Sequence, residues 1–290
     1  MSIFFEHNST IYENQYGFRS GRSCEHALLN AQNTLNDTLN KKQIALLLLI
    51  DFSKAFDMVD HGILLAKLNH YGIRGNALNW LASYLNNRKQ YVSVNGKNSS
   101  QAYLKYGVPQ GSILGPLLFL IYINDIPNIC QIAKFILYAD DANIIVTGSN
   151  ITEIKNNIYI LTQKLVTWVN INGLALNLKK TKYMLFSRKR GLEDFEVMIN
   201  RTKIERKTES RFLGVIVDEK LNWSKHIQTL KSKMSKYIGI MGKLKFQIPT
   251  KARLFIYNSL VQSHLNFCSS IWGFAAKSNI EKLFTVQKRL

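Results

Sequence analysis

The stretch FILYADDANIIV, residues 135–146, carries the strongest structural signal in the chain. Two apolar runs flank the adjacent carboxylates Asp140 and Asp141, a pattern that predicts a β-hairpin with the acidic pair at its tip. Neighbouring carboxylates repel each other and resist burial, and a divalent cation neutralises them directly. An Asp-Asp pair is more often an ordinary turn than a reactive site, so the rest of the sequence has to decide between these interpretations.

A further carboxylate follows an apolar run that shows no alternation. Ile44–Ile50 reads IALLLLI, which is typical of a central strand buried on both faces and is too short to span a membrane. Asp51 follows this run, at the strand end where open sheets usually carry their chemistry. If the strand pairs beside the hairpin, Asp51 and Asp140 face each other. Such oxygen ligands suit Mg²⁺, and two ions roughly 4 Å apart would activate an attacking oxygen and stabilise a leaving one.

The composition indicates a globular protein with a polyanionic partner. The 290 residues are 46% hydrophobic and 20% charged, and 38 Lys and Arg against 19 Asp and Glu leave a net charge of +19. This excess favours nucleic acid or an anionic membrane surface, and the absence of a long apolar segment or amphipathic anchor favours nucleic acid. Cys24, Cys130 and Cys268 have neither disulfide-framework nor zinc-ligand spacing, and no signal peptide is visible, so we expect an intracellular protein.

The N-terminal part contains YGFRSGRS, residues 16–23, which places Arg19 and Arg22 among glycines and serines. Ser23 is a candidate N-cap for a helix that runs through Leu35. Arginines on a flexible backbone near a helix start favour a phosphate clamp. A solvated basic loop explains the same pattern equally well.

The middle of the chain supplies further candidates. Phe56 follows Asp51 closely enough in the sequence to line the same pocket as that carboxylate. Asp60 is a candidate N-cap for the next helix. The stretch Gln90–Tyr106 predicts a hairpin that turns at Asn95–Gly96.

The stretch GVPQGSILGP, residues 107–116, specifies a particular backbone path. Its glycines allow close approach of the backbone to a ligand, and Pro116 fits the first turn of a helix running through Ile123. Gln110 is the only long polar side chain in the stretch, and its amide either binds a nucleotide or braces the loop.

The C-terminal half predicts a helix from Thr152 to Ile171, then strands, then basic helices. The strands are expected at Lys182–Ser187, Phe195–Ile199 and Arg211–Ile216. The basic helices are expected from Trp223 onward and at Lys251–Trp272. Such helices suit contact with a duplex backbone, although a solvated basic face explains them too.

Taken in order, these blocks resemble the reverse transcriptase domain of non-LTR retrotransposons of the LINE type, in particular the jockey-like ones. The blocks are similar to the second fingers motif (Gln15–Arg19), the first palm motif (Leu48–Asp57), the glycine-rich template and nucleotide motif (Gly107–Pro116), the metal-binding hairpin (Tyr138–Asp141), the lysine motif (Asn177–Thr181) and the primer-grip strand (Phe212–Val215). Each block alone is a weak signal. Their occurrence in the expected order over nearly the whole chain makes the resemblance specific.

The resemblance implies an α+β fold, a right-hand polymerase with fingers, palm and helical thumb. The palm is expected to be a ferredoxin-like (RRM-like) antiparallel sheet with helices on one face. The implied parts are residues 1–43 (partial fingers), 44–60 (first part of the palm), 61–106 (connection between fingers and palm), 107–216 (second part of the palm) and 217–290 (thumb). The implied activity is RNA-directed addition of dNTP to a primer 3′-OH. Its partners are an RNA template and a DNA primer or target DNA, with no membrane and a nuclear site of action.

The resemblance also implies roles for individual residues. Asp51 and Asp140 would be the main ligands of two Mg²⁺ ions, which Mn²⁺ can replace, together with the Phe52 carbonyl and Asp141. Phe56 would exclude a ribose 2′-OH, and Lys180 would be the acid for the departing pyrophosphate. The other implied nucleotide contacts are Arg19, Arg22, the backbone N–H groups of Lys54 and Ala55, and Gln110. The implied primer and template contacts are Gly111, Leu213 and Gly214.

The chain is shorter than the family pattern at both ends. It begins just upstream of the second fingers motif and stops at Arg289–Leu290, after the second expected thumb helix, so we expect a fragment with intact catalytic motifs. One alternative is a catalytically weak nucleic-acid-binding remnant of such an element. A two-metal nuclease also uses clustered carboxylates, but it gives no role to Phe56 or to the glycine-rich loop. A group II intron-type maturase is a further alternative within the same fold.

Overall fold

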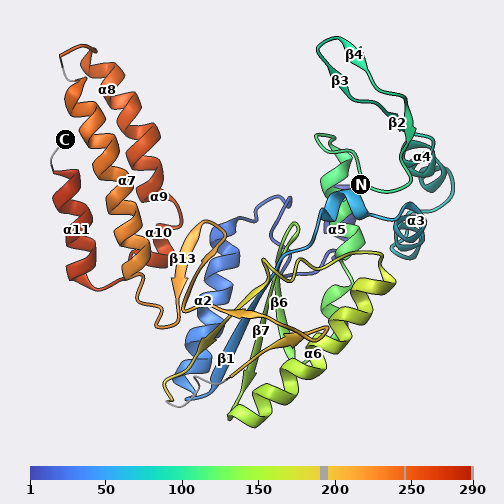
Figure 1. Ribbon diagram of the computed structural model, residues 1–290, viewed down its shortest axis with the longest axis horizontal. Coiled ribbons are helices and arrows are strands. Elements are labelled where there is room, and N and C mark those ends of the chain that lie inside the picture. Colours follow the sequence, from blue (N-terminus) through green and yellow to red (C-terminus); the bar gives the residue numbers. More distant parts are fainter. Residues whose placement is uncertain (190–194, 245, 289–290) are drawn as a thin grey trace.

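The computed structural model describes residues 1–189, 195–244 and 246–288, and its centre is a five-stranded sheet (Figure 1). In spatial order the strands are β11 (Glu205–Arg206), β8 (Lys182–Phe186), β1 (Ile44–Ile50), β7 (Asp141–Gly148) and β6 (Ala133–Tyr138). β1 pairs antiparallel with β7 and β8, β7 pairs antiparallel with β6, and the short edge strand β11 runs parallel to β8. The apolar run of β1 therefore takes the central position that its lack of alternation predicts, and the expected antiparallel sheet is confirmed.

Helices cover both faces of the sheet, whereas the sequence analysis expected them on one. Ala45 and Leu47 of β1 point into a core with α2 (Cys24–Asn40). Leu46 and Leu48 point into the opposite core with α5 (Leu114–Ile123) and α6 (Ile151–Ile171). The reason is that β1 is apolar on both sides, so each side has to be covered. α2 lies within residues 1–43, the expected partial fingers, yet it packs on the palm sheet.

Two short-range capping signals were predicted correctly, and a third cap lies elsewhere than expected. The Ser23 side chain accepts a hydrogen bond from His26 N at 3.3 Å at the start of α2. The Asp60 side chain accepts one from Ile63 N at 2.9 Å at the start of α3 (His61–His70). Thr152, from which the sequence predicted the helix and which was its candidate cap, lies inside α6; the cap is Asn150, whose side chain accepts a hydrogen bond from Glu153 N at 2.9 Å.

One end of the molecule is formed by short helices and a protruding hairpin. These elements are α1 (Ser2–His7), the 3-10 helix η1 (Ala55–Met58), α3, α4 (Gly75–Leu85), β2 (Lys89–Gln90), β3 (Ser93–Val94), β4 (Lys97–Asn98) and β5 (Ala102–Tyr103). β2 pairs with β5 and β3 pairs with β4. The hairpin turns at Asn95 and Gly96, which both have positive φ, as predicted from the Asn-Gly pair.

The segment after α6 contains one clear difference from the sequence analysis. The single strand expected at Arg211–Ile216 is a hairpin of β12 (Glu209–Phe212) and β13 (Val215–Asp218). Leu213 (φ 44°) and Gly214 (φ 89°) form its turn. The other short elements are η2 (Ile126–Ile129), β9 (Met198–Ile199) and β10 (Thr202–Lys203).

The opposite end consists of helices, the part of the chain that the sequence analysis expects to be the thumb, and they are called the thumb helices below. It consists of α7 (Ser224–Lys243), α8 (Thr250–Tyr257), the π-helical turn η3 (Asn258–Gln262), α9 (Ser263–Asn266), α10 (Ser269–Trp272) and α11 (Lys277–Gln287). The helix expected at Lys251–Trp272 is broken after Asn266, where Cys268 has φ 50°. The expected chain end at Arg289–Leu290 lies outside the described residues.

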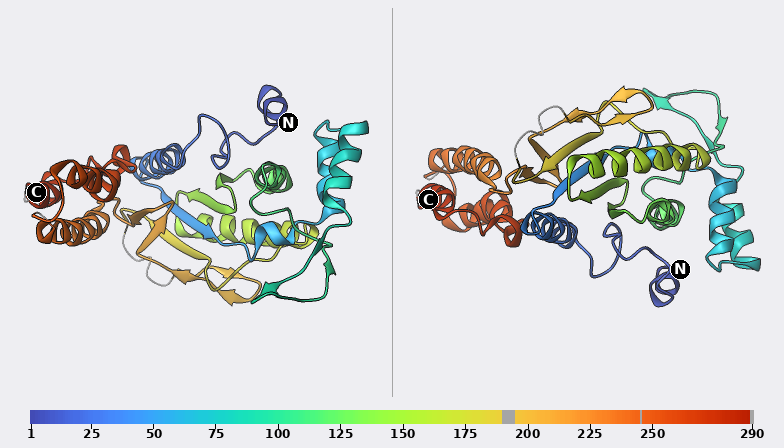
Figure 2. Two further views of the ribbon diagram at one scale, coloured as in Figure 1. Left: turned by 90° about the horizontal axis from the view of Figure 1, so that it is seen from above. Right: turned by 90° about the horizontal axis from the view of Figure 1, so that it is seen from below.

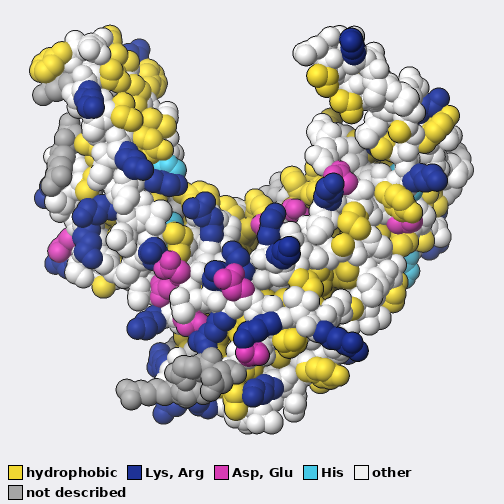
Figure 3. Space-filling model, viewed as in Figure 1, with side chains coloured by type: hydrophobic (Ala, Val, Ile, Leu, Met, Phe, Trp, Pro, Cys, Tyr) yellow, Lys and Arg dark blue, Asp and Glu magenta, His cyan; other side chains and the backbone are white. Residues whose placement is uncertain are grey.

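The two ends stand apart above the sheet. Figure 1 shows the thumb helices on one side and α3, α4 and the protruding hairpin on the other, and Figure 2 shows the same separation from above and below. The space-filling view shows a hollow between the two ends (Figure 3). Within the described ranges, no helix combines the length and the apolar character that a membrane crossing requires.

Candidate active site

Three carboxylates lie at one end of the central strands. Asp140 is exposed in the two-residue turn of the β6–β7 hairpin, and Asp141 is the first residue of β7. Asp51 directly follows β1 and is half-buried. In the register of the two strands, Ile50 lies opposite Ala142, so Asp51 comes next to Asp141. The predicted hairpin tip and the predicted pairing of the two strands are both confirmed, but the register sets Asp51 opposite Asp141 rather than Asp140.

The electrostatics of these carboxylates favour a cation. Partial burial raises the pKa of Asp141, and the neighbouring charges of Asp140 and Asp51 raise that pKa further. The donor set is made of hard carboxylate oxygens, the ligands that Mg²⁺ prefers, so the residues fit this ion chemically. Across the described ranges, however, no three His, Cys, Asp or Glu side chains form a ready metal-binding cluster.

Asp51 is held by the lysine motif, Asn177–Thr181, which the sequence analysis expects near the site. Asn177 N donates to the Asp51 carbonyl oxygen at 2.8 Å, and Asp51 N donates to Thr181 Oγ1 at 3.4 Å. Thr181 is fully buried. These contacts bring the lysine motif beside the strand end, and Lys180 lines a pocket of about 140 Å³ together with Asp51, Asp141 and Leu213. The pocket gathers predicted residues from distant parts of the chain.

The N-terminal segment braces the hairpin tip, a contact that sequence analysis missed. Leu137 N donates to the Asn14 carbonyl oxygen at 2.9 Å, and Tyr16 N donates to the Leu137 carbonyl oxygen at 2.8 Å, so this segment runs along β6. The buried Gln15 side chain accepts hydrogen bonds through Oε1 from Gly17 N at 2.9 Å and Ala139 N at 3.1 Å. Ala139 has φ 53°, a conformation that non-glycine residues rarely adopt.

Gly17 lies directly against the backbone of the same tip. A Cβ atom at this position would lie 2.3 Å from Ala139 N and 3.0 Å from the Tyr138 carbonyl carbon. The glycine in the YGFR block therefore permits close approach to the acidic hairpin. This glycine was the one sequence signal that could have revealed the contact.

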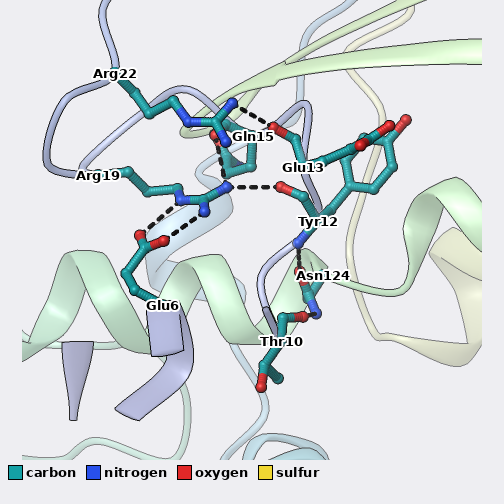
Figure 4. A network of polar contacts seen from close by, with 8 residues as sticks. All are labelled: Glu6, Thr10, Tyr12, Glu13, Gln15, Arg19, Arg22 and Asn124. Carbon is teal, nitrogen blue, oxygen red and sulfur yellow. Dashed lines mark hydrogen bonds and ion pairs between the residues drawn. The ribbon is translucent and has the colours of Figure 1, made fainter. Parts of the chain in front are cut away.

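Arg19 and Arg22 take part in a polar network that sequence analysis did not foresee (Figure 4). Arg19 donates to both carboxylate oxygens of Glu6 at 2.7 and 2.5 Å, and to the carbonyl oxygens of Tyr12 and Gln15. Four of its five N–H donors are thus engaged. Its bond to Glu6 holds the pKa of that carboxyl below its usual value. Contact between Arg19 and a triphosphate would require Glu6 to move away.

Arg22 is engaged more loosely than Arg19. It donates to the Glu13 carbonyl oxygen at 2.6 Å and lies over the Tyr16 ring at 5.5 Å (Figure 4). Its side chain is exposed, which fits both a solvated basic loop and a phosphate clamp.

Phe56 and the glycine-rich loop form a second group of predicted residues. The Phe56 ring stacks on the buried Phe119 at 4.3 Å and meets the exposed Phe18 edge-on at 6.4 Å. Gln110 Nε2 donates to Asp57 Oδ1 at 2.8 Å, so the amide braces the loop against η1.

The chain enters η1 through Lys54, whose φ is 47°. Ala55 is the first residue of η1 and is buried. Gly111, in the glycine-rich loop, has a positive φ as Lys54 does. None of these residues lines the 140 Å³ pocket, so the structure divides the predicted residues into two neighbouring groups.

A family profile described as reverse transcriptase (RNA-dependent DNA polymerase) matches residues 3–217, which include every block discussed above. The chain belongs to the reverse transcriptase family. Its relatives include the probable RNA-directed DNA polymerase from transposon X-element of Drosophila melanogaster, which is 26% identical over 286 residues. The RNA-directed DNA polymerase from mobile element jockey of Drosophila funebris is 27% identical over 291 residues. The matches cover 96% and 95% of this reverse transcriptase chain but 31% of each relative.

Solved structures support the polymerase-like fold. Apo telomerase from Candida tropicalis matches with a TM-score of 0.54 at 11% identity, over 99% of this chain and 52% of that chain. Telomerase from Candida albicans in complex with a fragment of telomeric RNA matches with a TM-score of 0.50 at 13% identity, over 99% of this chain and 49% of that chain. At these identities the likeness shows the fold alone.

Proposed function

We propose that this chain is the polymerase core of a non-LTR retrotransposon and adds deoxynucleotides to a primer 3′-OH along an RNA template. The observation that carries this proposal is the meeting of Asp51, Asp140 and Asp141 at the end of adjacent strands in a reverse transcriptase fold. The molecule is hollowed above the sheet, between the proposed thumb and fingers (Figure 3), which would give a duplex room. Because the target of such an element is chromosomal DNA, we place the reaction in the nucleus.

Each residue has a defined task in this proposal. Asp51 and Asp140, with Asp141 and the Phe52 carbonyl, hold the divalent cations. When bound there, Mg²⁺ or Mn²⁺ supplies the lowered pKa of the 3′-OH and the charge that stabilises in-line attack. Lys180 donates the proton to the departing pyrophosphate from its place in the pocket.

The second group selects and positions the substrate. Phe56, backed by Phe119, excludes a ribose 2′-OH. The remaining tasks are triphosphate binding by Arg19, Arg22 and the N–H groups of Lys54 and Ala55, nucleotide and template contact by Gln110 and Gly111, and primer support by Leu213 and Gly214.

The charge distribution supports a nucleic-acid substrate. The chain carries a net charge of +19, and no Asp or Glu occurs between His61 and Asn124. This acid-free segment forms α3, α4 and the protruding hairpin beside the hollow (Figure 1). Its exposed aromatic rings include Trp80, Tyr91 and Tyr103, which can stack on bases, while the lysines and arginines attract phosphates.

The test is primer extension on an RNA template with a DNA primer, Mg²⁺ and dNTP. We expect Asp140→Asn to lower the rate by about 100-fold or more, whereas Asp37→Asn, at an exposed position on α2, should leave it unchanged. Failure of the natural chain to extend, with salt-sensitive binding retained, would contradict the proposal and favour a binding remnant. Cleavage of the template without dNTP would favour a nuclease.

Phe56 has a separate test, because substrate selection is a ratio. We expect Phe56→Ala to raise the rate with rNTP relative to dNTP. The ratio is insensitive to any loss of folded protein, since both substrates are offered to the same preparation. An unchanged ratio would remove Phe56 from the proposed 2′-OH selection.

A further inference from the structure

Two cysteines that lie far apart in the sequence meet where the thumb helices contact α2. The Sγ atoms of Cys24 and Cys268 are 4.0 Å apart, although the two residues are separated by 244 positions in the chain. Cys24 is the first residue of α2, and Cys268 directly precedes α10. Both are free thiols in the structure. We call these two residues the thiol pair.

The thiol pair lies inside a packed interface. α10 packs against α2, and Figure 2 shows the thumb helices beside α2 in both views. Cys268 belongs to the same apolar core as Ala27 of α2 and Ile271 of α10. Next to the sulfur atoms, the Glu25 carboxylate accepts a hydrogen bond from the Ser270 hydroxyl. The surrounding contacts therefore hold the two sulfur atoms close together.

The two thiols differ in their access to solvent. Cys24 is half-buried, whereas Cys268 is only 3% exposed. Burial raises the pKa of Cys268 to about 12, and the neighbouring Cys24 contributes to this rise. Cys268 therefore stays protonated, and an oxidant from solution reaches the Cys24 sulfur first.

The third cysteine is separated from the thiol pair by the sheet. Cys130 is 3% exposed and lies in the core that α5 and α6 form with one face of the sheet. The thiol pair belongs to the core on the opposite face, where α2 packs. Cys130 is therefore a control inside the same molecule, since it is buried like Cys268 but has no access to Cys24.

We propose that hydrogen peroxide converts Cys24 and Cys268 into a reversible disulfide that ties the thumb helices to α2. In the first step the Cys24 sulfur attacks one peroxide oxygen and the O–O bond breaks, which leaves a sulfenic acid on Cys24 and releases water. In the second step the Cys268 sulfur attacks the Cys24 sulfur and the S–O bond breaks. The departing hydroxyl takes the Cys268 proton and leaves as a second water molecule.

The electrons of the reaction balance, because the two thiols lose two electrons and one peroxide molecule gains them. The second step is favoured by the arrangement of the thiol pair. The sulfur atoms have to approach from 4.0 Å to about 2 Å, a change within the range of rotation about a Cα–Cβ bond. A sulfenic acid is neutral, so oxidation of Cys24 also removes one of the causes that raise the pKa of Cys268.

Reduction by a thiol such as glutathione reverses the bond, which suits a protein of a reducing compartment. The proposal does not depend on the proposed polymerase function, because it concerns only the contact between α2 and the thumb helices.

The test maps the disulfide on the natural chain. Reduced protein at low concentration is treated with hydrogen peroxide, the remaining thiols are alkylated in urea, and the peptides are identified by mass spectrometry. We expect Cys24 and Cys268 to be recovered in one linked peptide pair, Cys130 to be alkylated, and dithiothreitol to restore all three thiols. Unlinked Cys24 and Cys268 after oxidation, a link to Cys130, or dimers joined through Cys24 would overturn the proposal.

Single substitutions test the order of the two steps. In Cys268→Ser the sulfenic acid on Cys24 has no thiol to attack it, so we expect dimedone to capture it there. In Cys24→Ser we expect Cys268 to remain a thiol, because it is buried. Capture of dimedone by Cys268 in Cys24→Ser would overturn this order. The mapping on the natural chain needs no variant, so it is decisive even where a substitution disturbs folding.

Thermal unfolding tests the tie between the helices. The disulfide would close a loop of about 244 residues, and a long loop restricts the unfolded chain strongly. We expect peroxide to raise the Tm of the natural chain by about 5 °C and to leave the Tm of Cys24→Ser unchanged. A disulfide that forms without raising the Tm would show that the bond distorts the interface, and would refute the tie.

Discussion

The contact between Gly17 and the acidic hairpin predicts a large effect from a single methyl group. In Gly17→Ala the new Cβ would lie 2.3 Å from Ala139 N, whereas ordinary contact begins near 3.4 Å. The atoms it meets belong to the backbone, so no side chain can rotate away. The hairpin tip must retreat by about 1 Å, the difference between these distances, and Asp140 and Asp141 move with it.

The magnitude follows from that displacement. A shift of about 1 Å in a catalytic group lowers the rate about 100-fold, and forced overpacking costs about 1–3 kcal/mol of stability. Single-turnover primer extension measures the first effect and urea denaturation the second. The control is Gly239→Ala in α7, where a Cβ meets nothing within 4 Å and helix propensity favours Ala. A Gly17→Ala protein with natural rate and stability would refute the packing of this segment against the tip.

Other changes probe the charges and caps. Asp141→Asn should stabilise the metal-free protein against thermal unfolding at pH 7 by about 0.5 kcal/mol. Because the pKa of Asp141 is raised in the folded state, the natural chain gains the same stability when the pH falls through that pKa. The difference in stability between variant and natural chain should therefore vanish in acid. Glu6→Gln should release Arg19 from its ion pair and lower the free energy of unfolding by less than about 1 kcal/mol. The same variant should change the KM for dNTP, and an unchanged KM would show that Arg19 does not bind the triphosphate. Asp60→Ala should cost about 1 kcal/mol in urea denaturation through loss of the α3 cap, and no loss would contradict the cap.

Local signals in the sequence were sufficient for much of the fold. The unbroken apolar run of Ile44–Ile50 predicted a central strand. The Asn95–Gly96 pair predicted the turn of the protruding hairpin. Ser23 and Asp60 were recognised as caps because a cap acts on backbone groups within three residues. Strand pairing also predicted that Asp51 lies at the acidic hairpin tip, although the register sets it beside Asp141 rather than Asp140.

Contacts between distant segments could not be obtained in this way. Apart from Gly17, nothing near Gln15 indicates that its side chain will accept a hydrogen bond from Ala139 N, and nothing near Arg19 indicates that its guanidinium will pair with Glu6. Arg211 and His226 line one pocket beside a hairpin that was expected to be a single strand. Hydrogen bonds within a turn or cap depend on a few consecutive residues, whereas these contacts depend on how whole elements pack. Residue type and order therefore identify the family and its acidic strand ends, and three-dimensional packing selects which polar groups are paired and which stay available to a ligand.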